Sequence, residues 1–204
     1  MTLQVKHLSF ARNDELLLSD IHFNLQMGEL LQVAGDNGSG KSTLLRIIAG
    51  LLTPESGEIL WENKANNIHY LGHLNALKLP LTVEENFRFA ASLKSSVHAT
   101  SLTDFIIEKN AAFAPLKKLQ HRQTLQLSEG QKRRVALARL LLSDAALWIL
   151  DEPTTALDHD GQVLFFNLLK KHLEEGGMAI ITTHHDIPDI FSTKKILRLG
   201  AQHV

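Results

Sequence analysis

The segment ELLQVAGDNGSGKSTLLRIIAG, residues 29–50, decides the fold of this chain. Its first residues, 29–34, form a short apolar run typical of a buried strand, and residues 41–50 have the apolar spacing of a helix. Between them, residues 35–42 match the pattern G-x-x-x-x-G-K-[ST]. The alternative is an ordinary glycine-rich turn into a helix. The strand before and the helix after the turn favour a loop that binds phosphate.

The residue types in this loop suit a nucleotide. Its glycines allow backbone N–H groups to surround the β-phosphate, Lys41 neutralises β- and γ-phosphate oxygens, and Ser42 offers its hydroxyl to Mg²⁺. The predicted nucleotide-binding residues are the loop and the start of its helix: Gly35, Asp36, Asn37, Gly38, Ser39, Gly40, Lys41, Ser42 and Thr43.

Segments on both sides of the loop predict a layered α/β fold. The first 26 residues read as strands, and residues 146–153 and 178–185 read as buried parallel strands separated by an amphipathic helix. Strand–helix–strand units around one phosphate loop indicate a parallel sheet covered by helices. From about residue 74 to 142 the pattern is helical.

The whole chain, residues 1–204, is expected to be a single domain with a helical insert. About residues 1–72 and 143–204 form the nucleotide-binding core, which includes an N-terminal β part, and about residues 73–142 form the insert.

Composition excludes several function classes. The net charge is −1 and the basic residues are dispersed, which argues against binding of nucleic acid or lipid by charge alone. The absence of Cys excludes a disulfide scaffold and a thiolate metal site. No apolar run approaches the roughly 18 residues of a membrane span. If the protein works at a membrane, a partner is expected to bring it there.

Acidic residues close the strand at residues 146–153. Asp151 is expected to hold Mg²⁺ through water, and Glu152 beside it to polarise the attacking water. His184 ends the other buried strand and is expected to lie near the γ-phosphate, although His185 follows it directly. The predicted catalytic residues are therefore Lys41, Glu152 and His184.

A second candidate anion site begins at residue 126 with QLSEGQKRR. Ser128 can cap a helix there, and Gly130 leaves backbone N–H groups accessible before three basic residues. One nucleotide does not require two such helix starts in one chain.

Five features follow one another in the order found in the ATP-binding cassette ATPases of membrane transporters. They are the glycine-rich loop, LSEGQ at 127–131, LWILDEP at 147–153, TALD at 155–158 and TTH at 182–184. The chain resembles that family over nearly its whole length. The resemblance implies a P-loop NTPase fold with an antiparallel N-terminal β part, and it implies ATP and Mg²⁺ as ligands.

The resemblance also explains the second anion site. It implies a head-to-tail homodimer in the ATP-bound state, in which each ATP lies between the Lys41 loop of one copy and the signature segment of the other. The residues expected to act across this interface are Ser128, Glu129, Gly130, Gln131 and Asp158.

A narrower resemblance lies in YLGHLNALKLPLTVEENFRF, residues 70–89, which is similar to the ATP-binding subunits of cytochrome c biogenesis systems of the haem-export type. It implies that ATP hydrolysis drives release of a haem-loaded chaperone from a complex of integral membrane subunits. The chain would bind peripherally at the cytoplasmic face of the bacterial inner membrane, without contacting nucleic acid or haem directly. The alternatives are another small exporter, a cassette acting outside transport, and a non-hydrolytic regulatory cassette.

Three positions depart from the commonest cassette pattern. His73 replaces a Gln that contacts Mg²⁺ and the attacking water, so it either takes that role or only contacts the membrane subunit. Glu129 replaces a Gly and either points into solvent, which we favour, or weakens ATP binding. Phe10 stands near the place of a Tyr that stacks on adenine, and it either stacks or belongs to the core.

Overall fold

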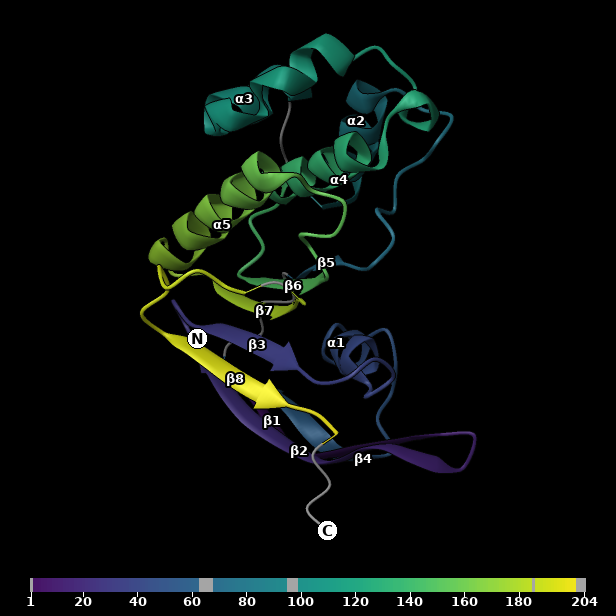
Figure 1. Cartoon of the computed structure of the whole chain (residues 1–204), viewed down its shortest axis with the longest axis vertical. Coiled ribbons are helices and arrows are strands. Elements are labelled where there is room, and N and C mark those ends of the chain that lie inside the picture. The colour runs from purple at the N-terminus through teal and green to yellow at the C-terminus, as the bar shows by residue number, and fades with distance from the viewer. Residues whose placement is uncertain (1, 63–67, 95–98, 185, 201–204) are drawn as a thin grey trace. The chain divides into compact units, whose positions relative to one another are not determined.

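The computed structural model describes residues 2–62, 68–94, 99–184 and 186–200, and the chain forms two compact units. Unit 1 comprises Met1–Gly72, Ala145–Glu152 and Leu168–Val204, and unit 2 comprises His73–Asp144 and Pro153–Asn167. Helix α5 (His159–Glu174) begins in unit 2 and ends in unit 1 (Figure 1).

Unit 1 contains two sheets. The antiparallel sheet has the strand order β2-β1-β4, formed by β1 (Thr2–Arg12), β2 (Glu15–Gln26) and β4 (Ser56–Trp61). The parallel sheet has the order β5-β6-β7-β3-β8, formed by β3 (Leu30–Ala34), β5 (Ile68–Leu71), β6 (Leu147–Asp151), β7 (Met178–Thr182) and β8 (Lys194–Arg198). The predicted α/β class, with a parallel core sheet and an antiparallel N-terminal part, is confirmed.

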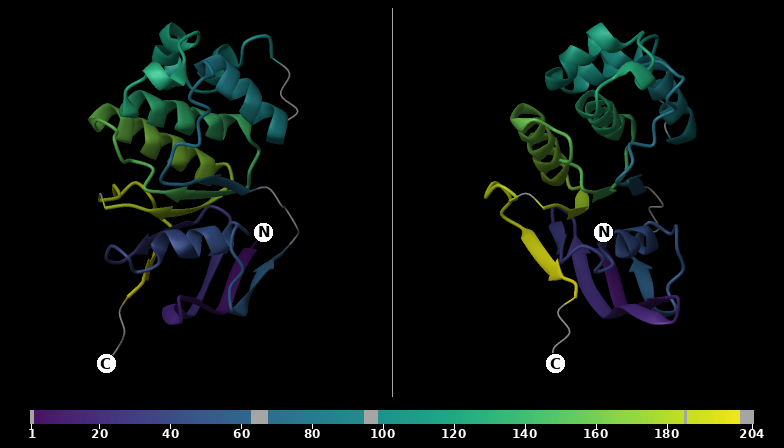
Figure 2. Two further views of the ribbon diagram at one scale, coloured as in Figure 1. Left: turned by 90° about the vertical axis from the view of Figure 1, so that its right-hand side faces the viewer. Right: turned by 45° about the vertical axis from the view of Figure 1, so that its right-hand side comes forward.

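Helix α1 (Lys41–Ile48) packs between the two sheets of unit 1 (Figure 2). It buries four apolar residues, Leu44, Leu45, Ile47 and Ile48, in one core with side chains of both sheets. Strands β6 and β7 are buried at every position, as expected for central strands of a parallel sheet that is covered on both faces. This packing fixes α1, and with it the glycine-rich loop that precedes the helix.

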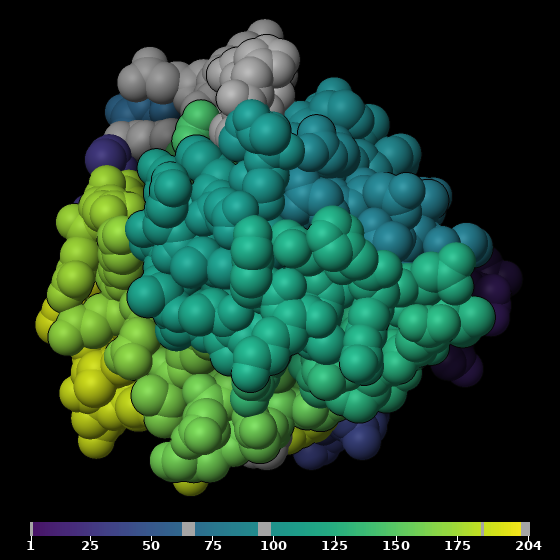
Figure 3. All heavy atoms as spheres, turned by 90° about the horizontal axis from the view of Figure 1, so that it is seen from above, coloured from purple at the N-terminus to yellow at the C-terminus, as the bar shows by residue number. Residues whose placement is uncertain are grey.

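Unit 2 is helical. Besides the start of α5, it contains α2 (Val83–Lys94), α3 (Leu102–Lys109), η1 (Ala111–Leu119), η2 (Thr124–Gln126), α4 (Glu129–Ala138) and η3 (Arg139–Leu142). Its own core includes Phe87, Ile106, Phe113 and Val135, each at most 1% exposed. Figure 3 looks onto the surface of this unit, where its teal and green side chains lie together. Within the described part of the chain, no helix is both long and apolar enough to cross a membrane.

A half-buried histidine joins the end of α5 to the parallel sheet. The ring of His172 stacks on Trp148 of β6, with centroids 3.8 Å apart and planes 4° from parallel. Its Nε2 lies 3.1 Å from the carbonyl oxygen of Met178. Burial lowers the pKa of His172 to about 4, against the weaker opposing effect of that carbonyl. The folded protein therefore favours the neutral ring.

This histidine should make the fold sensitive to acid. An unfolded histidine titrates near pH 6.5, so between about pH 6.5 and 4 the unfolded state binds a proton that the folded state does not. The free energy of unfolding should fall by up to about 3 kcal/mol across this range through His172 alone. In urea unfolding from pH 7 to 4.5, His172→Phe, which keeps an aromatic ring, should show a shallower pH dependence than wild type. His121→Phe, at an exposed position, is the control; parallel pH curves for wild type and His172→Phe would contradict the prediction.

Candidate functional site

The glycine-rich loop connects the end of β3 to α1. Its backbone takes left-handed conformations at Gly38 (φ 85°) and Gly40 (φ 93°), which favour glycine. A Cβ on Gly40 would approach Leu18 Cδ2 to 2.8 Å, whereas one on Gly38 would meet no atom within 4 Å. The loop therefore packs against the sheet on one side and is open at Gly38.

The start of α1 is accessible to an anion. Gly40 occupies the N-cap position and makes no side-chain cap, so the first N–H groups of the helix depend on another partner or on water. Lys41 folds back over the loop, where its Nζ donates to the carbonyls of Gly35 at 2.7 Å and Asp36 at 2.8 Å. Phosphate oxygens are stronger acceptors than carbonyls for an ammonium group. We expect Lys41 to leave these carbonyls when phosphate enters.

The predicted acids lie at the carboxyl end of β6, beside the carboxyl end of β7. Asp151 is paired in register with Thr182, and the hydroxyl of Thr182 donates to Asp151 Oδ1 at 2.7 Å. Glu152 follows directly with φ 51°, its side chain only 12% exposed. His184 Nε2 lies 3.4 Å from Glu152 Oε1, and the His184 side chain is 58% exposed. The imidazole can therefore reach both this carboxylate and solvent.

In unit 2 the signature segment forms a capped helix start. Ser128 is the N-cap of α4: its Oγ accepts from the N–H of Gln131 at 3.3 Å, and the Gln131 side chain accepts from the N–H of Ser128 at 3.0 Å. This reciprocal pair is a capping box. Glu129 is 69% exposed and pairs with Lys132 at 2.8 Å, so its carboxylate points into solvent in this structure.

A cavity of about 420 Å³ gathers the predicted interface residues of unit 2. Ser128, Gly130, Gln131 and Asp158 all line it. The Asp158 carboxylate accepts from the N–H of Gly161 at 2.9 Å and from Arg134 at 2.6 Å, and these contacts lower its pKa in that order. A Cβ on Gly130 would come within 2.9 Å of the Ala156 carbonyl oxygen, so glycine allows the close approach of these two backbone segments beside the cavity.

Two arginines, one buried and one half-buried, hold the loop that follows His73, and sequence reasoning missed both. Arg133 is 2% exposed; its Nε donates to the Pro153 carbonyl at 3.0 Å and its guanidinium donates to Asn75 Oδ1 at 3.1 Å. Arg139 donates to the carbonyls of Asn75 at 3.3 Å and Ala76 at 3.0 Å. Arg133 belongs to the basic run after Gly130, but its partner Asn75 lies 58 positions earlier in the chain, and Ala76 lies 63 positions before Arg139.

The remaining predicted residues take these positions. Phe10 lies in β1 opposite Leu18 and packs, half-buried, against the core of unit 1. His73 is exposed in unit 2, whereas Ser42 and Asp151 belong to unit 1, so a shared metal site of these three residues stays a prediction. His185 lies outside the described residues.

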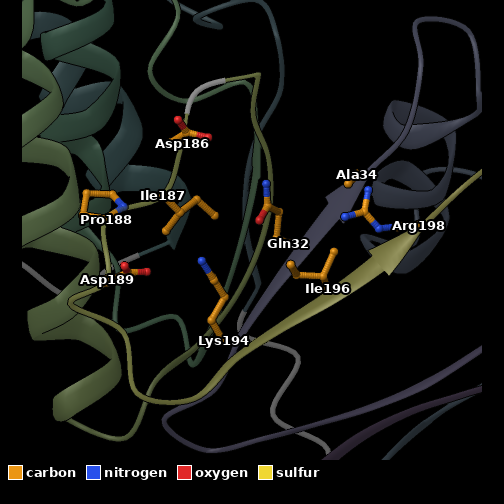
Figure 4. A pocket seen from close by; sticks show the side chains of 9 residues that line it. All are labelled: Gln32, Ala34, Asp186, Ile187, Pro188, Asp189, Lys194, Ile196 and Arg198. Carbon is orange, nitrogen blue, oxygen red and sulfur yellow. The ribbon is translucent and has the colours of Figure 1, made fainter.

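A larger cavity of about 600 Å³ lies elsewhere in unit 1, against β3 and β8. Figure 4 shows Gln32, Lys194 and Arg198 from these strands among the residues that line it, together with Asp186 and Ile187. None of the predicted site residues lines it. Among the described residues, no group of three or more His, Asp or Glu side chains has the arrangement of a metal site.

Known proteins are similar to this chain over most of its length. The pattern of the ABC transporter family matches residues 18–155. The chain is 43% identical to the cytochrome c biogenesis ATP-binding export protein CcmA of Vibrio cholerae, over 97% of this chain and 98% of that protein. It is 40% identical to the protein of the same description from Cupriavidus pinatubonensis, over 98% and 90%.

A solved structure shares the fold. It is the dimeric, post-hydrolysis state of the ATP-binding cassette MJ0796 bound to ADP and Pi, with a TM-score of 0.78, 28% identity, and coverage of 97% of this chain and 94% of that one. The similarity to this structure covers nearly the whole chain, including the glycine-rich loop, the acids at the carboxyl end of β6 and the capped start of α4. The chain belongs to the ABC transporter family, among its cytochrome c biogenesis ATP-binding export proteins.

Proposed function

We propose that this chain binds ATP with Mg²⁺ at the carboxyl ends of β3 and β6 and hydrolyses it as the energising subunit of a cytochrome c maturation complex. The observation that carries the proposal is the joint placement, in unit 1, of the open loop before α1 and the acidic pair Asp151 and Glu152 on strands of one parallel sheet. Ligands of open α/β sheets bind outside the carboxyl ends of the strands.

The residues of unit 1 fit a magnesium nucleotide. The loop is open at Gly38, where a Cβ would meet no atom within 4 Å, and the uncapped start of α1 offers N–H groups to phosphate. Ser42 and Asp151 supply the oxygen ligands that Mg²⁺ prefers, Asp151 through water. Bound Mg²⁺ would neutralise phosphate charge during hydrolysis. Glu152 polarises the attacking water. His184, whose Nε2 lies 3.4 Å from Glu152 Oε1, lies near the γ-phosphate.

The second half of the site comes from a second copy of the chain. The cavity at Ser128 and Gly130 lies at a helix N-terminus, which favours an anion. The γ-phosphate that Lys41 of one copy holds binds to the Ser128 and Gly130 cavity of the other copy. Asp158 lies at the same interface between the copies. The dimeric, nucleotide-bound state of the ATP-binding cassette MJ0796 supports this assembly.

The relatives that are named as cytochrome c biogenesis export proteins support the following cellular role. The chain works with integral membrane subunits at the cytoplasmic face of the bacterial inner membrane. There, ATP hydrolysis drives release of a haem-loaded chaperone. The alternative is the energising subunit of another small exporter.

The test is restoration of cytochrome c maturation in a bacterial strain that lacks its own protein of this group. The gene should be expressed together with the membrane subunits of the cytochrome c maturation system from the same organism. Covalent haem in c-type cytochromes is then measured by haem staining. Wild type should restore maturation, Lys118→Ala at an exposed position should match it, and Lys41→Ala should lower it at least about tenfold because the charge on the phosphates is no longer neutralised. An expressed wild-type protein that hydrolyses ATP but restores nothing would favour the other exporter.

A further inference from the structure

The hydroxyl of Thr182 joins the two acids at the end of β6. Thr182 is the last residue of β7, is fully buried, and is paired in register with Asp151 on the neighbouring strand. Its Oγ1 accepts from the backbone N–H of Glu152 at 2.9 Å and donates to Asp151 Oδ1 at 2.7 Å.

The chemistry of the partners fixes the direction of both bonds. A backbone amide can only donate, and an ionised carboxylate can only accept, so a group between them must do both. A hydroxyl does both, and the hydrogen bond to a charged carboxylate is the stronger of the two. Valine has the same shape but offers neither function. The hydroxyl is therefore specifically required in this position.

The two hydrogen bonds of Thr182 orient the side chains of Asp151 and Glu152. Glu152 has φ 51°, a left-handed conformation that is unfavourable for a non-glycine residue. The bond from its N–H to Thr182 holds this backbone and thus the direction in which its carboxylate leaves the chain. The bond to Asp151 Oδ1 orients the carboxylate that would face Mg²⁺. Since the γ-methyl group restricts χ1 of a β-branched residue, Thr182 holds both with little rotation.

We propose that Thr182 is a positioning residue for the reaction, setting the Mg²⁺-side carboxylate of Asp151 and the water-side carboxylate of Glu152 through one hydroxyl. This inference rests on the proposed ATPase function. Residues that orient metal ligands through hydrogen bonds typically contribute 10- to 100-fold to metal affinity or activity. We expect an effect of that size from Thr182, expressed through Mg²⁺ rather than through ATP itself.

The experiment compares wild type with Thr182→Val, Thr182→Ser and the control Thr193→Val, which removes a hydroxyl bonded to the Gly28 carbonyl elsewhere in unit 1. Two quantities are measured: ATP affinity by calorimetry, with EDTA and across a Mg²⁺ titration, and steady-state hydrolysis over the same titration. Thermal unfolding of each variant is recorded in parallel.

Thr182→Val should bind ATP in EDTA within about twofold of wild type, need about tenfold more Mg²⁺ for half of the affinity gain, and turn over about 10- to 100-fold more slowly. Thr182→Ser should stay within about threefold of wild type, since it keeps the hydroxyl. If Thr182→Val does not fold, Thr182→Cys, with only a weak donor, should show the same increase in the Mg²⁺ requirement.

Two results would overturn the proposal. One is an unchanged Mg²⁺ dependence in the valine and cysteine variants, even if their melting temperatures fall, because that is the result of a purely structural hydroxyl. The other is loss of ATP affinity in EDTA that matches the loss with Mg²⁺. If wild type itself shows no Mg²⁺-dependent ATP hydrolysis, the proposed function fails, and this inference fails with it.

Discussion

Glu152→Gln should lower ATP turnover by about 100- to 10,000-fold, the usual contribution of a general base. Gln has nearly the same shape as Glu but cannot take a proton from water. The Glu152 side chain is 12% exposed and lies 3.4 Å from His184, so the amide should fit without rearranging the strand end. ATP affinity should remain close to that of wild type, and the uncleaved γ-phosphate should hold two copies together. Phosphate release gives the rate, and size-exclusion chromatography with ATP should show a dimer.

The matched control is Glu175→Gln, which changes an exposed carboxylate directly after α5 that pairs with Lys171. It should keep wild-type turnover, since exposed pairs contribute about 0–1 kcal/mol to stability. Turnover of Glu152→Gln within about threefold of the control would remove the role of general base from Glu152. A Glu152→Gln protein that binds ATP with wild-type affinity but stays monomeric would instead contradict the proposed dimer.

Ser128→Arg should abolish hydrolysis while leaving ATP binding intact. The arginine would fill the cavity that Ser128 and Gly130 line, where the γ-phosphate of the other copy is expected. Loss of the N-cap costs about 1 kcal/mol, too little to unfold the unit. ATP binding should persist because Lys41 and its loop belong to unit 1. Calorimetry with ATP and phosphate release measure the two effects, with Ser192→Arg at an exposed position as the control.

Mixing two inactive variants tests whether the sites are shared between copies. In a dimer of Ser128→Arg with Lys41→Ala, one site carries both changes and the other carries neither. Equal mixing forms mixed dimers in about half of all pairs, each with one intact site, so up to about a quarter of wild-type turnover should return. Each variant alone should stay inactive. A mixture as inactive as its components would mean that each ATP is completed within one chain.

The sequence by itself determined the parts of this protein that depend on neighbouring residues. The strand, glycine-rich loop and helix at residues 29–50 lie where the pattern predicts them, because apolar period and glycine conformations act locally. The capping of α4 by Ser128 could also be predicted, since both partners of a capping box lie within one helical turn. The position of Asp151 and Glu152 could also be predicted, because these two acids end a run of buried residues.

Only the tertiary structure decided which distant side chains complete these parts. Thr182 meets Asp151 across 31 positions of sequence, and Arg133 meets Asn75 across 58. His172 becomes a neutral ring because folding buries it against Trp148, not because of any residue beside it. Such contacts depend on strand register and on the desolvation of polar groups, and both are set by the packed chain as a whole. A threonine or an arginine has no periodic signal of its own, so its role became visible only with its partner in place.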